Sequence, residues 1–248
     1  MSSNAAKIYT KYNHTPDEIW KEVIKQSASD PIIDGITFPL LPDEKTQCHY
    51  VGSTLALNTQ EPYQYYKAIK DTYEARVGSI GEQTKLLDVG SGWGRIMRFF
   101  MKDIVPSNLF GCDVSRTSFD ICNSCFRGEL NFQLINPLPP LPYEDDFFDI
   151  VEGYSVFTHL SYYAVLLWMN EYFRILKPGG MLAMTVWKDR RFDYIQKLQG
   201  EPLRSPDSDR YHYILQSSFS RDCQLEKELY EKTGVVYIPY SPDPDSTY

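Results

Sequence analysis

A glycine-rich turn at residues 90–94 limits most strongly what this chain can fold into. The short apolar run at 85–89 is typical of a buried strand, and it carries an acid at Asp88. Three glycines at alternate positions follow, and then an apolar run at 96–101 that suits a helix packed on a sheet. Strand, glycine turn and helix predict the first unit of a doubly wound α/β sheet. Ligands of such sheets bind outside the carboxyl ends of the strands.

The spacing of these glycines bears on the kind of ligand. The turn reads G-x-G-x-G through Gly90, Gly92 and Gly94, whereas a dinucleotide-binding turn expects G-x-G-x-x-G. Arg95 stands where the third dinucleotide glycine would be. An acid two residues before the first glycine, Asp88, completes a pattern that resembles motif I of the class I S-adenosylmethionine-dependent methyltransferases.

Composition and charge exclude several classes of protein. A chain of 248 residues with 42% hydrophobic residues can build one α/β domain with a small appendage. A net charge of -8 argues against a nucleic-acid partner, which needs a basic surface. Without a secretory leader or a long apolar run, we expect a cytoplasmic protein with no membrane partner. Cys122 and Cys125 form a lone CxxC, too few ligands for zinc, so we expect reduced thiols and no metal.

The next two predicted strands continue the pattern. Residues 108–113 form a strand that ends in Asp113, 19 residues past Gly94. A carboxylate there can accept hydrogen bonds from the ribose hydroxyls of an adenosine; the alternative is a surface acid that caps a helix over 118–126. A third strand at 131–135 leads into the proline-rich loop 136–142, which can be neither helix nor central strand.

Two more strands and a helix stop complete the core. Residues 145–155 predict a fourth strand that ends at Tyr154 and Ser155. A helix then runs to the stop Leu176–Gly180, and a fifth strand follows at 181–187. These motifs, with Phe148-Asp149, occur in the order found in class I S-adenosylmethionine-dependent methyltransferases and cover residues 85–187. The stretch 154–160 is also similar to a bacterial subgroup associated with the modification of glycans and surface polysaccharides.

The resemblance implies an α/β fold with a doubly wound, Rossmann-like and mostly parallel sheet, an S-adenosyl-L-methionine cofactor and a methyltransferase activity (EC 2.1.1.-). It places cofactor contacts at Asp88, Gly90, Ser91, Gly92, Gly94, Arg95, Asp113, Val114, Asn136, Pro137, Leu138, Tyr154 and Ser155. Most relatives have Asp where this chain has Asn136, whose amide oxygen can still accept a hydrogen bond. Asp88 would bond either the glycine-turn backbone or the cofactor's ammonium group. Arg95 is either a partner of the cofactor's carboxylate or a helix-surface arginine.

The regions on either side define three expected parts: a helical cap at 1–80, the core at 81–187 and a short C-terminal part at 188–248. The cap should start one helix with Thr15 as its capping residue and with Ile19, Trp20, Val23 and Ile24 on one helical face. A second helix opens at 61 and carries the stripe Tyr63, Tyr66, Ile69 and Tyr73. The loop 30–44 lies between them. The cap either folds over the crevice, where His49 and Tyr50 would reach the site, or simply covers the sheet.

The C-terminal part is short for a sheet of this family, whose last two strands usually form a hairpin. We expect helices at 192–198 and 223–232, and a single strand at 235–238 before the acidic end 241–248. One strand cannot form a hairpin, so we expect the sheet to be incomplete at one edge. An exposed edge invites pairing with another chain, which makes a homodimer plausible.

Methyl transfer needs the acceptor aligned with the methyl group within about 3 to 3.5 Å. A general base is required when the acceptor is a hydroxyl, and His159 is the candidate; the alternative is a histidine held by backbone near a helix start. We therefore expect a methyltransferase that acts on a hydroxyl of a small molecule or glycan. A non-catalytic scaffold of the same fold remains open. An NAD-dependent oxidoreductase is disfavoured by Arg95 and by the lack of Tyr-x-x-x-Lys after the fourth strand.

Overall fold

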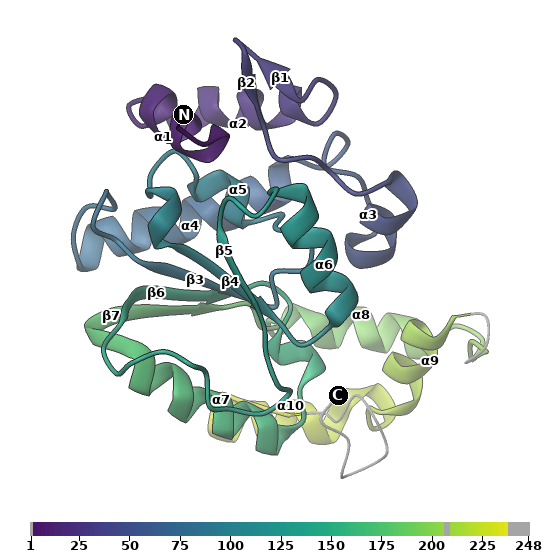
Figure 1. Cartoon of the computed structure of the whole chain (residues 1–248). Coiled ribbons are helices and arrows are strands. Elements are labelled where there is room, and N and C mark those ends of the chain that lie inside the picture. Colours follow the sequence, from purple (N-terminus) through teal and green to yellow (C-terminus); the bar gives the residue numbers. More distant parts are fainter. Residues whose placement is uncertain (1, 206–208, 238–248) are drawn as a thin grey trace. The chain divides into compact units, whose positions relative to one another are not determined.

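The computed structural model describes residues 2–205 and 209–237 (Figure 1). The chain forms two compact units. The first comprises Met1–Tyr154 and Met169–Met184, and the second comprises Ser155–Trp168 and Thr185–Tyr248. Part of the expected strand at 235–238 and all of the acidic end at 241–248 lie outside the described residues. The expected boundaries near residues 80 and 187 stay a prediction.

A five-stranded parallel sheet forms the centre of the first unit, in the order β5-β4-β3-β6-β7. Its strands are β3 (Leu86–Val89), β4 (Leu109–Asp113), β5 (Asn131–Leu134), β6 (Phe148–Gly153) and β7 (Leu176–Met184). The strand order reverses between β3 and β6, so the carboxyl ends of these strands border the switch point of a doubly wound sheet. The predicted fold class is confirmed.

Helices cover both faces of this sheet (Figure 1). One face packs against α4 (Gln60–Arg76), α5 (Met97–Phe100) and α6 (Arg116–Cys125). The second half of α7 (Tyr162–Ile175) lies on the other face. The stripe predicted on α4, Tyr63, Tyr66, Ile69 and Tyr73, is buried as expected. Both cysteines of the CxxC are buried, free thiols in α6.

The N-terminal segment adds α1 (Asn4–Tyr12), α2 (Asp17–Ser27), α3 (Glu44–Val51) and a hairpin of β1 (Ile32–Ile33) and β2 (Ile36–Thr37). The hairpin lies within the predicted loop. Trp20 and Ile24 of α2 are buried, but Ile19 is 57% exposed, so the predicted apolar face of this helix is only partly buried. The capping role of Thr15 was also wrong, because Pro16 occupies the N-cap and no side chain bonds there.

The edge strand β7 differs from the prediction at its start. It begins at Leu176, directly after α7, so the predicted stop sequence lies inside the strand. A register shift between Phe148 and Ile150 absorbs this irregular start. Among the described residues no strand pairs with the outer side of β7, so the expected incomplete edge lies there. Val235, Val236 and Tyr237 belong to no strand, and the homodimer stays a prediction.

The second unit is helical. It contains η2 (Phe157–His159), α8 (Arg190–Gln199), α9 (Arg210–Ser217), η3 (Arg221–Cys223) and α10 (Gln224–Thr233). Its own core consists of Phe192, Ile195, Leu198, Leu215 and Cys223. Two of these helices were predicted, and α9 was not. Within the described ranges no helix is long and apolar enough to cross a membrane.

Candidate cofactor site and active site

The glycine turn after β3 needs its glycines for backbone reasons. Gly90, Gly92 and Gly94 have φ values of 67°, 55° and 75°, a region that side chains disfavour. A Cβ atom on Gly94 would overlap the Phe126 ring. The Gly90 amide donates to the Cys112 carbonyl at 2.8 Å, which fixes the turn to the end of β4. The turn is therefore close-packed and presents backbone at the carboxyl end of the sheet.

Asp113, at the end of β4, is bonded to the glycine turn. The Gly92 amide donates to its Oδ2 at 3.0 Å, and the Ser115 amide donates to its Oδ1 at 2.8 Å. Burial raises the pKa of Asp113, while these amides counteract the rise. Ser115 caps α6, so Asp113 lies at the start of that helix and at the glycine turn together. A carboxylate oxygen accepts more than one hydrogen bond, so contact with a ribose hydroxyl stays possible.

The proline-rich loop lies next to Asp113. Leu134 is the register partner of Asp113, and the Ile135 amide donates to the Asp113 carbonyl at 3.0 Å. Asn136 and Pro137, which follow, are exposed, and Leu138 is half-buried. Three sequence-predicted regions thus meet at one end of the sheet: the glycine turn, the acid of β4 with Val114, and this loop.

Tyr50 of α3 reaches the same turn. A Cβ atom on Gly92 would lie 3.5 Å from Tyr50 Cδ1, and the Tyr50 hydroxyl hydrogen-bonds Ser118 Oγ at 2.8 Å. His49 is exposed. The sequence left open whether the N-terminal segment covers the sheet or folds over the crevice. It does both, because α4 covers the sheet and α3 places the Tyr50 ring over the glycine turn.

Arg95 is buried, with 6% of its surface exposed, so the helix-surface alternative was wrong. Its Nη2 lies 3.4 Å from Glu61 Oε1, and its guanidinium lies 4.9 Å from the centre of the Tyr154 ring. The Tyr154 hydroxyl also donates to Glu61. Burial alone would raise the pKa of Glu61, but Tyr154 and Arg95 lower it. The three side chains form one polar cluster beside the glycine turn.

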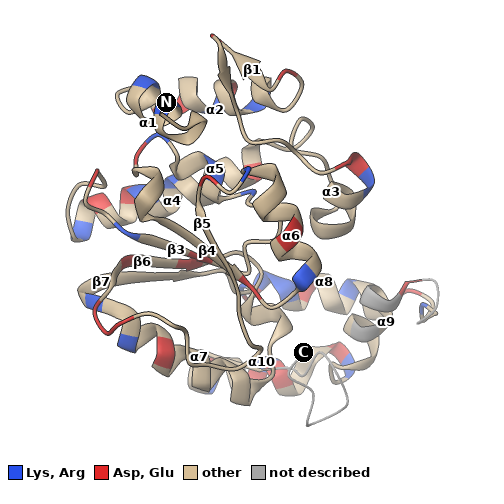
Figure 2. Ribbon diagram, viewed as in Figure 1, with Lys and Arg blue, Asp and Glu red and all other residues tan. Residues whose placement is uncertain are grey.

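Two further acids lie inside the sheet, where Figure 2 shows acidic positions within its strands. Asp88 of β3 and Glu152 of β6 are register partners, 3% and 0% exposed. Burial raises the pKa of Asp88 to about 7, and burial beside Asp88 raises the pKa of Glu152 well above 4.5. Sequence reasoning missed Glu152, although a charged residue in an otherwise apolar parallel strand is a usable signal. It also missed Glu61, which carries no local motif.

Comparison with known proteins decides the family. The family model described as "Methyltransferase domain" matches residues 87–184, which run from β3 to the end of β7. A demethylmenaquinone methyltransferase of Staphylococcus aureus (strain JH9) is 25% identical over 214 residues, covering 78% of this chain and 87% of that protein. Residues 87–184 form a methyltransferase domain of the class I S-adenosylmethionine-dependent superfamily. The oxidoreductase and scaffold alternatives are thereby set aside.

Solved structures are similar to this methyltransferase at lower identity. The YcgJ protein of Bacillus subtilis aligns with a TM-score of 0.44 and 21% identity, over 55% of this chain and 59% of that one. The sugar N-methyltransferase KedS8 of a Streptoalloteichus species aligns with a TM-score of 0.43 and 17% identity, over 52% of this chain and 49% of that one.

Ser155 and His159 of this methyltransferase lie in the second unit. Ser155 has a φ of 63°, and its amide donates to Thr185 Oγ1 at 2.6 Å. Its hydroxyl lies 3.4 Å from His159 Nε2. His159 is exposed at the surface, yet partial burial of its ring lowers its pKa below 6.5. The imidazole is therefore mostly neutral at pH 7 and can accept a proton.

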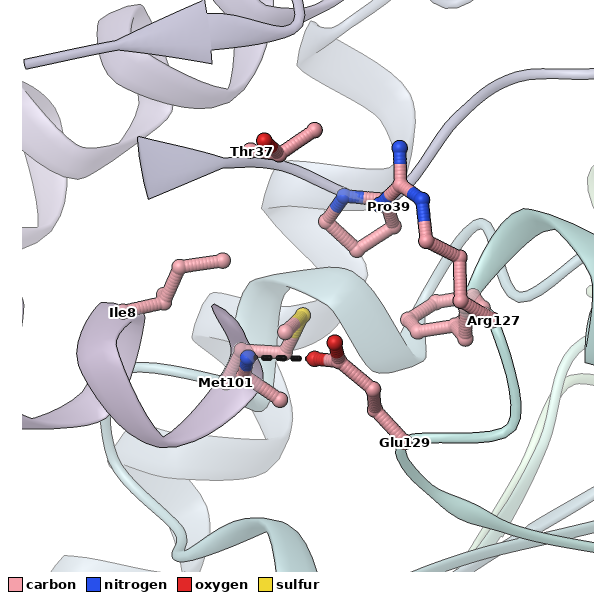
Figure 3. Close-up of a pocket in the computed structure, with 8 residues that line it drawn as sticks. Ile8, Thr37, Pro39, Met101, Arg127 and Glu129 are labelled. Atoms are coloured by element: carbon pink, nitrogen blue, oxygen red, sulfur yellow. Dashed lines mark hydrogen bonds between the residues drawn. The ribbon is translucent and has the colours of Figure 1, made fainter. Parts of the chain in front are cut away.

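A pocket in the first unit lies among other residues (Figure 3). It has room of about 10 Å³, enough for one water, and Ile8, Pro39, Met101 and Glu129 are among the residues that line it. The Glu129 carboxylate accepts from the Ala5 amide at 2.6 Å, near the start of α1. This pocket contains none of the predicted site residues.

Proposed function

We propose that this methyltransferase transfers the methyl group of S-adenosylmethionine to a hydroxyl of a small molecule or glycan. The observation that carries the proposal is the His159 imidazole, whose pKa is lowered by partial burial and whose Nε2 lies 3.4 Å from the Ser155 hydroxyl. A hydroxyl acceptor must lose a proton during transfer, and a neutral imidazole is suited to take it. The net charge of -8 disfavours an acceptor in nucleic acid.

In this proposal the polar groups at the end of the sheet bind the cofactor, which supplies the activated methyl group. The Asp113 carboxylate accepts from the ribose hydroxyls, and the Asn136 amide oxygen accepts from the adenine amine. The glycine turn allows close approach of the cofactor's amino-acid part. Arg95 pairs with the cofactor's carboxylate, sharing its guanidinium with Glu61.

His159 acts as the general base, with Ser155 orienting its ring. Protonation of the imidazole removes the base, so kcat/KM should fall as the pH drops through the lowered pKa of His159. The rate should be insensitive to this group above about pH 6.5, the ordinary value for histidine.

The experiment is methyl transfer from S-adenosylmethionine to a panel of sugars, small alcohols, phenols and quinones, followed by mass spectrometry. Quinones are included because the Staphylococcus aureus relatives are named demethylmenaquinone methyltransferases. With a hydroxyl acceptor, His159→Gln should lower kcat by about 10²- to 10⁴-fold and leave cofactor affinity unchanged. His14→Gln, at an exposed histidine of the first unit, is the control. Transfer confined to ring carbons, or an unchanged rate in His159→Gln, would refute the proposal.

A further inference from the structure

Two carboxyl groups face each other at the carboxyl ends of the two central strands. Asp88 and Glu152 are register partners on the parallel strands β3 and β6. Register partners on neighbouring strands point to the same face of a sheet, so their side chains lie side by side. The pair is two residues before the glycine turn and two before Tyr154.

The pair lacks hydrogen-bond donors. Asp88 Oδ2 and both carboxyl oxygens of Glu152 are buried without a hydrogen-bond partner. Buried polar atoms are nearly always paired, so three such oxygens in one place indicate a missing donor or a shared proton. Two adjacent carboxyl groups cannot both ionise without a large free-energy cost. One proton shared between them supplies part of the missing hydrogen bonding.

The groups around the pair supply no free donor. The titratable and charged groups that face it are Tyr65 of α4, Arg95 of the glycine turn, Cys112 and Asp113 of β4, and Cys122 of α6. The Tyr65 hydroxyl, which also lowers the pKa of Glu152, has one proton, and the carbonyls of Ala183 at 2.8 Å and Gly153 at 3.2 Å compete for it. Arg95 is engaged by Glu61. A bound cation with several N–H donors would supply the hydrogen bonds that these neighbours do not give to the two carboxyl groups.

We propose that Glu152 is a cofactor-positioning residue that shares one proton with Asp88 and releases it when the cofactor's primary ammonium group binds. In the free protein the Glu152 carboxyl donates to the Asp88 carboxylate. On binding, that proton leaves to solvent and the ammonium N–H groups donate to both carboxylates. The pair then carries two negative charges against the ammonium and Arg95. This inference rests on the proposed cofactor function and adds a residue and a proton to it.

The pKa shifts agree with this arrangement. Burial, together with the proximity of the two acids, raises the pKa of Asp88 to about 7 and that of Glu152 well above its ordinary value, so above about pH 7 Asp88 is ionised and the proton that the pair retains lies on Glu152. A cation placed between them favours the ionised forms and lowers both pKa values. Binding of the ammonium group is therefore linked to proton release, and the affinity should rise with pH until the free pair is ionised.

The experiment is isothermal titration calorimetry of the full chain at pH 8, where Asp88 is ionised, in buffers of different ionisation enthalpy, which counts the protons released. S-adenosylhomocysteine should release close to one proton. 5′-Methylthioadenosine has the same nucleoside without the amino-acid part and should release none. Equal proton counts for the two ligands, or none for S-adenosylhomocysteine, would overturn the inference while leaving the cofactor function intact.

Glu152→Gln tests the residue itself. Glutamine keeps the size of the side chain and donates an N–H to Asp88, but it has no proton to release. We expect proton release to vanish and the affinity for S-adenosylhomocysteine to fall about tenfold, with unchanged affinity for 5′-methylthioadenosine. Glu82→Gln, at an exposed glutamate of the same unit, should behave as wild type.

The outcomes separate this inference from the function on which it rests. Proton release that persists in Glu152→Gln would overturn the role of Glu152. If neither nucleoside binds the wild-type chain, the cofactor site itself is refuted and the inference falls with it. Should Glu152→Gln fail to fold, the proton count of the wild-type chain with the two ligands still decides the matter.

Discussion

Two groups of buried ionisable residues in the first unit differ in how the free-energy cost of burying charge is offset. A cluster between α2, α4 and α5 contains Asp17, Lys70, Lys102 and Asp103, in which each lysine lies 2.8 or 2.9 Å from both acids. The Tyr66 hydroxyl adds bonds to both acids, at 3.0 and 2.6 Å. The Asp88–Glu152 pair has two like charges and no such partner.

The difference separates a structural cluster from a candidate binding site. In the balanced cluster every charge has a neighbour of opposite sign, so the cluster fixes the N-terminal helices to the core without a ligand. In the like-charged pair, a retained proton offsets part of the cost of burial, and the carboxyl oxygens still lack hydrogen-bond donors. Perturbed acids in such a setting are candidates for function, because functional sites are where burial and like charges shift pKa values.

The largest effect on stability should come from the balanced cluster. Lys102 is 2% exposed, and Lys102→Met leaves Asp103 with Lys70, and Asp17 with Lys70 and the more distant Lys67 at 3.6 Å. Removing one partner of a buried ion pair costs about 3–5 kcal/mol, so the free energy of unfolding should drop by that amount in denaturant melts. The control is Arg116→Met, which breaks an exposed pair with Asp120 and should cost under about 1 kcal/mol. Equal losses of unfolding free energy in Lys102→Met and Arg116→Met would contradict this difference between buried and exposed ion pairs.

A smaller effect, with a defined pH dependence, should come from the like-charged pair. The folded-state pKa of Asp88, about 7, lies above its ordinary value of 3.8. The stabilisation from its bound proton is complete below about pH 4 and is lost as the pH rises to about 7. Asp88→Asn should remove this slope, which is on the order of 3 kcal/mol over the interval. Unfolding curves at pH 4 to 8 measure it, and identical slopes for variant and wild type would refute the raised pKa.

The opposite slope is expected for the balanced cluster. Burial alone would raise the pKa of Asp17, but hydrogen bonds from Lys102 and Lys70 hold it well below its ordinary value of 3.8. The stabilisation from Asp17 is thus present above about pH 4 and is lost as the pH falls. The same unfolding curves therefore distinguish the two groups of charges by sign.

The smallest effect should come from Asp113, whose carboxylate is satisfied by backbone rather than by a countercharge. Asp113→Ala removes the acceptor of the Gly92 amide and the proposed acceptor of the ribose. Loss of such charged hydrogen bonds should weaken the binding of S-adenosylhomocysteine by about 1.5–3 kcal/mol in calorimetry. Asp120→Ala on the exposed side of α6 is the control. Affinity within twofold of wild type would remove Asp113 from the site.

Much of the core could be predicted because its signals are local. Each strand of the sheet is a short apolar run bounded by glycine, proline or acid, so β3, β4, β5 and β6 begin within three residues of their expected positions. The start of β7 was missed because its proline and glycines are typical of a turn. Pairing with β6 through a register shift overrides that local preference.

Local signals in the sequence were enough to predict the doubly wound sheet, the glycine turn and the acid at the end of β4, since each depends on backbone conformation or periodicity within a few residues. Only the tertiary structure placed Tyr50 over Gly92, paired Arg95 with Glu61, and set Glu152 beside Asp88. These pairs are separated by 34 to 64 residues in the chain, from Glu61–Arg95 to Asp88–Glu152. Their electrostatics arise from burial and proximity, which exist only after the strands and helices have packed.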